Sequence, residues 1–498
     1  MEAPGERAEF ILVSANALER RRGHPMPYTS EVSSCCSYLL FLGLLFATSS
    51  AIIEQSLLSG TSIDSSAISP RQYAISLYSL LAILSLGVVV GYITQLCRLP
   101  GLLGMLLVGI ALRNTPGISE NLFVVKEWSI VLRRVAFVVI LLRGGLSLDA
   151  SAILRLKGAC FRLSFIPCTV EAIVVALSAK LVFGMDIVVG VLLGAALAAV
   201  SPAVVIPALL DASKSGYGVR AGVPSLVIAA ASLDDVYAIT VFSLALSFLI
   251  PSGGTTYMTV LAAPAEVFAG VFFGSLMGFL LHFLPRKDVE NLHLVRLVLL
   301  FTFSTAILFG TIKYGVDGAG AIAVLVSAFV AAYAWKKEGE LPEEDHLAII
   351  WNLTFQPLLF GLIGFELSFD LVKLETIALG CLILAIGLVF RLIASFLAVC
   401  GTSFTIRERL FVAVAWLPKA TVQAALAPVV LDLARSRNEP NPKLVEEGIV
   451  ILTIAVLSIL ITAPAGAFLI RILTPVLLTK EEEKRPSERS GVASGDES

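Results

Sequence analysis

The stretch Ser225-Leu-Val-Ile-Ala-Ala-Ala-Ser-Leu-Asp234-Asp235-Val-Tyr-Ala-Ile-Thr-Val-Phe242 places two adjacent carboxylates in the middle of an apolar helical pattern. The apolar run extends from Val223 to Ile250, which is longer than the roughly 20 residues that a helix needs to cross a bilayer. One acid at the centre of such a helix costs roughly 2.5–3.5 kcal/mol on insertion scales. A structural pair satisfied by neighbouring helices is one interpretation. The interpretation that we favour is a site for a cation and a proton in a transporter.

The composition is that of a membrane protein. Hydrophobic residues make up 57% of the 498 residues, charged residues 15%, and the mean hydropathy is +0.90. Because helices satisfy all their backbone groups within one segment, we predict an all-α polytopic membrane protein. A formal net charge of -2 argues against a nucleic-acid partner. The sequence contains no GxxxxGK[ST] motif, so nothing indicates that ATP hydrolysis drives transport. We therefore expect a transporter without a cofactor, and not an enzyme.

The apolar runs divide the chain into a membrane domain and two tails. Residues 1–34 are polar and are predicted to be a cytoplasmic tail. Residues 35–475 contain about fourteen apolar runs, which we interpret as transmembrane helices. Residues 476–498 form a charged C-terminal tail. An even number of crossings puts both tails on one side, and the distribution of Lys and Arg makes that side the cytoplasm.

The two halves of the membrane domain resemble each other at a spacing of roughly 220 residues. Leu146-Ser-Leu-Asp149 corresponds to Leu367-Ser-Phe-Asp370, and Glu171 falls opposite Arg391. This spacing corresponds to seven helices. Since seven is odd, the second copy is predicted to be inverted relative to the first, as in many secondary transporters.

Prolines interrupt one helix in each copy. Ser201-Pro202 and Pro207 lie in the helix of the first copy, and Pro418 and Pro428 lie in the corresponding helix of the second. Proline lacks an N–H and clashes with the preceding turn, so it frees carbonyl groups. We predict two broken helices that cross at a central site, with half-helix dipoles and free carbonyls facing it. A simple kink in each helix is the alternative.

Other charged residues lie close to this predicted site. Asp234 and Asp235 are about 100° apart around their helix, so one can face an ion cavity while the other meets a partner. Ala231 lies on their face and leaves space there. Glu171 and Arg391 are expected to form an ion pair inside the bundle, which is either mainly structural or tunes the site. Lys419 is expected either to neutralise carbonyls or an acid, or to extend toward the membrane surface.

Seven motifs give the chain a resemblance to a known family over roughly residues 75–475. It resembles the animal NHA branch of the sodium/proton antiporters, within the cation/proton antiporter-2 group (solute carrier family 9, subfamily B). The motifs are Leu103-Gly-Met-Leu-Leu107, Pro167-Cys-Thr-Val-Glu171, Val200-Ser-Pro-Ala-Val-Val205, Ser232-Leu-Asp-Asp235, Gln356-Pro-Leu-Leu-Phe-Gly-Leu-Ile-Gly364, Trp416-Leu-Pro-Lys-Ala-Thr-Val-Gln-Ala-Ala425 and Ile459-Leu-Ile-Thr-Ala-Pro464.

The resemblance implies a homodimer in a lipid bilayer, built from fourteen-helix protomers with a dimer domain and a moving six-helix core domain. It implies that Asp235 is the principal ligand of Na⁺ or Li⁺, that Asp234 assists it, and that both couple the cation to protons. The carbonyls of Val200 and Ala231 would complete the site, although glycine is expected at position 231. It also implies a Glu171–Arg391 pair, and a location in the plasma membrane or in endosomal or mitochondrial membranes.

Three functions are compatible with these features. The first is a Na⁺(Li⁺)/H⁺ antiporter that works by alternating access. The second is a Na⁺-coupled organic-anion symporter, and the third is a non-transporting receptor or scaffold. Arg391 cannot give up its proton and, if Glu171 holds it, Asp234 is left without that counter-charge. One-for-one, electroneutral exchange is therefore the simplest expectation.

Overall fold

The structure is a computed structural model, and it describes residues 70–148, 150–249, 256–339, 341–370, 372–436 and 441–480. The described part is built from helices. Within these ranges there is no β-strand. The predicted apolar run at 35–53, the tail at 1–34 and residues 481–498 lie outside them. The α-helices are α3 (Pro70–Leu96), α4 (Gly101–Asn114), α5 (Lys126–Ser147), α6 (Ala150–Phe183), α7 (Ile187–Ala198), α8 (Pro202–Lys214), α9 (Val223–Leu249), α10 (Thr256–Phe283), α11 (Leu292–Lys313), α12 (Asp317–Trp335), α13 (Pro342–Ile350), α14 (Gln356–Glu366), α15 (Leu374–Ala398), α16 (Ile406–Ala415), α17 (Thr421–Ser436) and α18 (Pro442–Leu477).

The helices are those of a multi-pass membrane protein. Ten segments of the described chain are long and apolar enough to cross a membrane, and one of them spans both α7 and α8. The predicted total of about fourteen crossings depends partly on residues 35–53, which the structure does not describe, and the total stays a prediction. Short 3₁₀ turns at Ser119–Asn121 and Lys336–Glu338 and a π-helical turn at Trp351–Phe355 complete the described elements.

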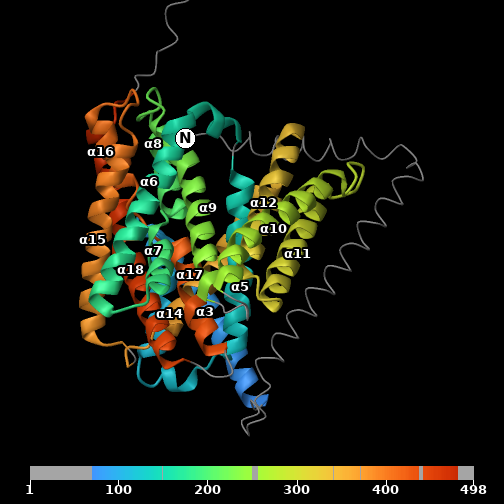
Figure 1. Cartoon of the computed structure of the whole chain (residues 1–498), viewed down its shortest axis with the longest axis vertical. Helices are drawn as coiled ribbons and strands as arrows, with labels where there is room; N and C mark the ends of the chain where they lie inside the picture. Colours follow the sequence, from blue (N-terminus) through green and yellow to red (C-terminus); the bar gives the residue numbers. More distant parts are fainter. Residues whose placement is uncertain are drawn as a thin grey trace, which may run out of the picture.

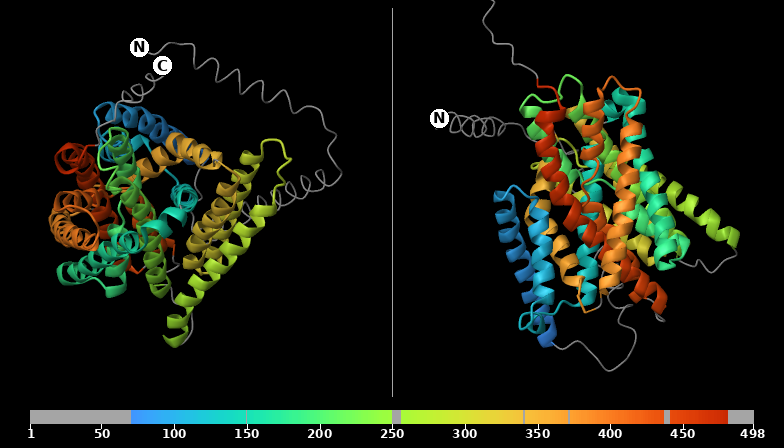
Figure 2. Two further views of the ribbon diagram at one scale, coloured as in Figure 1. Left: turned by 90° about the horizontal axis from the view of Figure 1, so that it is seen from above. Right: turned by 90° about the vertical axis from the view of Figure 1, so that its left-hand side faces the viewer.

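Two groups of helices pack against each other (Figure 1). One group contains α6 to α9 and α15 to α18, and the other contains α3 to α5 and α10 to α14. Seen from above, α10, α11 and α12 stand at one side of the molecule (Figure 2). The groups meet where α12 contacts α9 and where α17 contacts α5 and α14.

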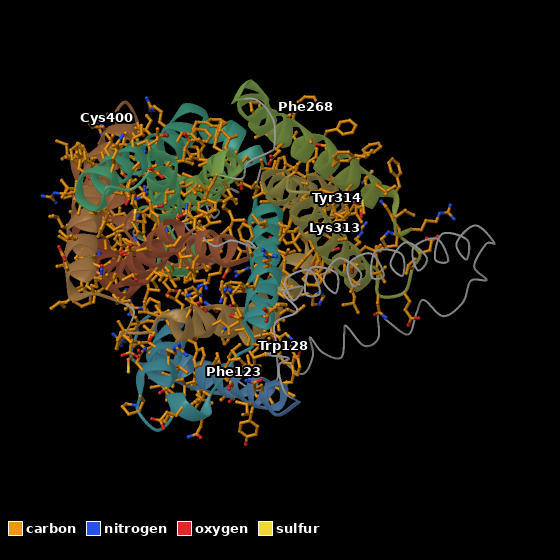
Figure 3. All side chains as sticks on the ribbon, turned by 60° about the horizontal axis from the view of Figure 1, so that its bottom comes forward. Phe123, Trp128, Phe268, Lys313, Tyr314 and Cys400 are labelled. Carbon is orange, nitrogen blue, oxygen red and sulfur yellow. The ribbon has the colours of Figure 1, made fainter. Side chains whose placement is uncertain are left out.

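Glycine allows α10 and α12 to pack closely. A Cβ at Gly270 or Gly274 would lie 2.7 or 2.6 Å from the carbonyl oxygen of Ala319 or Ala323, so a larger residue would push the helices apart. The opposite face of α10 carries exposed aromatic rings, including Phe268 (Figure 3). In a membrane protein such a face is suited to contact with lipid.

The two proline-containing helices are interrupted near their middle. α7 ends at Ala198, the backbone is extended at Ala199 and Ser201, and α8 begins with Pro202. Proline suits the first helical position because the N–H that it lacks would have no partner there. The second interruption covers 416–420, between α16 and α17, and contains Pro418. Pro207 and Pro428 lie inside continuous helices, so the prediction that they contribute to the breaks is wrong.

Candidate functional site

The two interruptions touch each other through their main chains. The Ser201 N–H donates to the Pro418 carbonyl at 2.7 Å, and the Lys419 N–H donates to Thr462 Oγ1 on α18 at 2.9 Å. Figure 1 shows α8 and α16 at the same end of the molecule, with α7 and α17 nearer the other. The two broken helices therefore run in opposite directions and cross at their breaks.

Side chains from the second half of the chain satisfy the C-terminal carbonyls of α7. These carbonyls have no partner within the helix and carry partial negative charge. Two of the donors are cationic and the third is an amide. Lys419 Nζ donates to Leu197 at 2.5 Å, Arg391 Nη1 donates to Ala198, and Gln423 Nε2 donates to Ala199 at 2.8 Å.

Glu171 lies between two cations in the protein interior. Its Oε2 is 2.7 Å from Arg391 Nη1, and its Oε1 is 2.7 Å from Lys419 Nζ. All three side chains have an exposed fraction of 0%. The interpretation of Lys419 as a side chain that extends toward the membrane surface is therefore wrong. Because buried charges are stable only when paired and hydrogen-bonded, these three residues form one unit.

Asp234 also contacts Arg391. Its Oδ2 accepts the Val200 N–H at 2.6 Å and lies 3.5 Å from Arg391 Nη2. Arg391 Nε meanwhile donates to the Trp416 carbonyl at 2.6 Å. The expectation that Arg391, once held by Glu171, leaves Asp234 without a counter-charge is wrong. The guanidinium has five N–H donors in a fixed fork, so one side chain can serve several acceptors.

Asp235 lines a cavity, and its carboxylate forms no ion pair with the described residues. The cavity has a volume of about 820 Å³, and Ser232, Pro202 and Thr421 also line it. Asp235 Oδ1 has no hydrogen-bond partner among the described residues. The two adjacent acids thus differ in environment: Asp234 binds protein groups, whereas Asp235 borders the cavity.

The cavity reaches the end of the molecule where α3, α8 and α18 finish and α13 starts. Arg98, Asp211 and Arg471 line it there, with Glu344 and Asp345 from the first turn of α13. Arg143, about one turn before the end of α5, also lines it, with its guanidinium 5.5 Å from the centroid of the Trp351 ring. The cavity that Asp235 lines therefore also carries charged side chains at this end.

Oxygen atoms around the crossing are available to a hard cation. Asp234 Oδ1 and Ser201 Oγ, like Asp235 Oδ1, have no hydrogen-bond partner among the described residues. Buried oxygens normally have partners, and carboxylate, hydroxyl and carbonyl oxygens are the ligands that hard cations prefer. Ala231 differs from expectation. It is buried inside the continuous helix α9, and its neighbour Ser232 lines the cavity instead.

Three polar residues of the site were not predicted individually. Gln423 caps α7, Thr462 anchors the second break, and Ser232 borders the cavity beside Asp235. Each lies inside a quoted motif. A polar residue in an otherwise apolar membrane helix was the available signal for all three.

Comparisons with known proteins agree with this geometry. Residues 81–474 match the family model described as sodium/hydrogen exchanger, transmembrane. The chain is 44% identical over 390 residues to sodium/hydrogen exchanger 9B2 of Homo sapiens, covering 78% of this chain and 72% of that protein. It is 41% identical over 423 residues to the 9B2 protein of Xenopus tropicalis, covering 84% and 78%. It is 38% identical over 411 residues to human sodium/hydrogen exchanger 9B1, covering 81% and 79%.

The fold also resembles that of a solved structure. The sodium proton antiporter MjNhaP1 from Methanocaldococcus jannaschii superposes with a TM-score of 0.66 at 17% identity, covering 82% of this chain and 99% of that one. From the family match and from relatives that align over most of their length, we conclude that this chain belongs to the sodium/hydrogen exchanger family.

Proposed function

We propose that this protein exchanges Na⁺ or Li⁺ for H⁺ across a membrane by alternating access, with one cation for one proton. The observation that carries the proposal is Asp235, a carboxylate that borders the cavity and has an oxygen without a partner among the described residues. The relatives of this chain are named sodium/hydrogen exchangers, which supports Na⁺ and H⁺ as the exchanged ions.

The charges around the crossing support a one-for-one exchange. Glu171, Asp234 and Asp235 supply three carboxylates, and Arg391 and Lys419 supply two cations in contact with the first two acids. One negative charge remains, and it lies at the cavity. A single Na⁺ or a single proton neutralises that charge, so the two ions compete for Asp235. A cycle that replaces one by the other moves no net charge.

In this proposal Asp235 is the principal ligand, and Asp234, Ser201 and the carbonyl of Val200 are the additional candidates. The carbonyl of Ala231 could join them only if α9 opened at that turn, because α9 is continuous there. The cation would be a transported substrate, and the proposal requires no resident metal or cofactor.

The group α6 to α9 with α15 to α18 is our candidate for the moving core domain, since it contains both broken helices and both aspartates. The other group would form a homodimer in the bilayer. Both tails would be cytoplasmic, in the plasma membrane or in endosomal or mitochondrial membranes. The predicted inverted repeat belongs to this proposal as well.

Purified protein in liposomes tests the proposal. An imposed Na⁺ gradient is expected to drive proton movement, read with a pH-sensitive dye, and Asp235→Asn should abolish it while the protein stays folded. Asp211→Asn is the matched control, because Asp211 lines the same cavity but is exposed at the end of α8. Robust Na⁺-driven proton movement by Asp235→Asn would overturn the assignment of the ligand.

A further inference from the structure

A small pocket lies between α6, α7 and α9, on the helices that also carry Glu171 and Asp234 of the buried ionic cluster, which we define as Glu171, Asp234, Arg391 and Lys419. Its volume is about 100 Å³. Three helices form it: α6, α7 and α9. The lining residues are Cys168, Thr169, Ala172, Ile173, Val191, Ala195, Tyr237 and Val241.

The wall of the pocket offers almost no free polar atom. Thr169 Oγ1 donates to the Phe165 carbonyl at 2.7 Å, so in the 2.8 Å hydrogen bond between Thr169 and Tyr237 the tyrosine hydroxyl is the donor. Both hydroxyls therefore have their partners in the protein. A water molecule needs two to four polar partners, whereas apolar cavities of about 150 Å³ bind molecules such as benzene. The pocket suits a hydrocarbon group.

The pocket opens toward the lipid-facing surface of α6. Ile173 at its rim is 54% exposed, and Ile166 and Leu177 on the same helix are also exposed. The crossing segments of α6 and α9 are Gly158–Phe183 and Val223–Leu249, so the pocket residues on both helices lie near the middle of their segments. In a bilayer that depth is occupied by the ends of the acyl chains.

The pocket residues adjoin the acids of the ionic cluster. Ala172 directly follows Glu171 in α6, and Tyr237 lies three residues after Asp234 in α9. Interiors are close-packed and transmit displacements. A group that enters between α6 and α9 is therefore expected to change the distances between Glu171, Arg391 and Asp234.

We propose that this pocket binds the terminal hydrocarbon segment of a membrane lipid acyl chain, and that its occupancy alters the rate of ion exchange. The effect on rate rests on the proposed exchange function. The binding does not, and it can be tested separately.

Photolabelling in nanodiscs tests the binding. The two probes are phosphatidylcholine with a diazirine at the end of one chain and the small apolar molecule trifluoromethylphenyl diazirine. Both are expected to label 168–173, 191–195 and 237–241 in a saturable way, and excess benzene should reduce that labelling. Phe268, which is 75% exposed on α10, is the reference for non-saturable contact with lipid (Figure 3).

Variants that fill the pocket sharpen the test. Val241→Phe should lower pocket labelling to the level of Phe268, and the smaller change Val191→Leu should act in the same direction if the first variant folds poorly. Leu177→Phe, one turn away on the exposed face of α6, is the control and should leave labelling intact. Non-saturable labelling, or labelling unchanged in both filled variants, would overturn the site. If only the small probe labels the pocket, the proposal that an acyl chain occupies the pocket is wrong.

Exchange in liposomes tests the effect on rate. Lipids with straight chains and lipids with terminally branched chains of equal length are compared. The wild-type rate is expected to differ roughly fivefold between them, the lower end of typical coupling between sites. Val241→Phe should remove the difference while retaining exchange. A filled variant that responds to chain branching as the wild type does would contradict the coupling. Absence of exchange in the wild type as well as in the variants would instead contradict the proposed function.

Discussion

Arg133 on α5 and Asp432 on α17 form a buried ion pair, with Arg133 Nη2 at 2.8 and 2.9 Å from the two carboxylate oxygens. Glu366 on α14 lies 3.7 Å from Arg133 Nη1 and also pairs with Arg435 on α17. These contacts join the two helix groups near the end of α17 that is remote from the break. The cavity opens at the other end, so the ion pair lies on the side of the site that faces away from the cavity mouth. Movement of the core group under alternating access would have to break it.

Removal of one partner of this pair should destabilise the protein strongly. Asp432→Asn leaves Arg133 buried without its carboxylate, a loss on the order of 3–5 kcal/mol for a buried pair. The double variant Arg133→Met/Asp432→Leu should lose less, because it buries no unpaired charge. Thermal unfolding in detergent measures Asp432→Asn, the double variant and the single variants Arg133→Met and Asp432→Leu, with Glu375→Gln at the exposed start of α15 as the control. Losses that simply add would show that the two residues are not coupled.

Arg391→Lys should impair exchange although it keeps the charge. The guanidinium contacts Glu171, Asp234 and the Trp416 carbonyl at once, and a lysine ammonium is a point charge without that fork. We expect the exchange rate to fall by about tenfold or more, which corresponds to roughly 1.4 kcal/mol. The measurement is Na⁺-driven proton movement in liposomes at matched protein density. A rate equal to the wild type would mean that charge alone, and not the shape of the guanidinium, holds the cluster.

Gln423→Leu should destabilise the break between α7 and α8. The amide donates to the Ala199 carbonyl at 2.8 Å and to the Leu197 carbonyl at 3.3 Å. A buried carbonyl that loses its donor costs about 1–3 kcal/mol. The expected result is a lower melting temperature together with slower exchange. Gln95→Leu, an exposed position on the cavity wall, is the control and should melt like the wild type.

An Na⁺ concentration jump on a solid-supported membrane should produce no sustained current. The reason is that the site retains a single uncompensated negative charge, which either one Na⁺ or one proton neutralises. Arg391 keeps its proton at all relevant pH values, and Lys419 uses its ammonium hydrogens on Glu171 and the Leu197 carbonyl. A pH-dye signal from the same liposomes should nevertheless appear. A sustained current that scales with the dye signal would rule out one-for-one exchange.

The local features of the site could be predicted from the sequence. A pair of acids inside an apolar run is a strong signal because lipid penalises charge, and Asp234 and Asp235 do lie in the middle of α9. The breaks at Pro202 and Pro418 also follow from local chemistry. The same rule wrongly implicated Pro207 and Pro428, since a membrane helix can accommodate a proline when neighbours satisfy the freed groups.

The ion pair between Glu171 and Arg391 was predicted, but the other connections between distant segments could not be predicted in the same way. The reach of Arg391 to four acceptors depends on how α6, α7, α9 and the end of α16 are placed in space, and no spacing along the chain encodes those distances. The cap by Gln423 likewise requires two half-helices to face each other. Ala231 illustrates the converse: it shares a helix face with the aspartates, but of the residues of α9 only Ser232 and Asp235 line the cavity.

The crossing of the broken helices has a consequence for genetics. The two breaks are joined in part by a hydrogen bond from the Ser201 N–H to the Pro418 carbonyl. Any residue other than proline at position 201 supplies the same backbone donor. A screen that replaces side chains one at a time would leave this bond intact, so a loss of exchange at position 201 would report the Ser201 hydroxyl and not the bond. Its contribution becomes visible only when the peptide itself is altered, for example by an ester in place of the amide at residue 201.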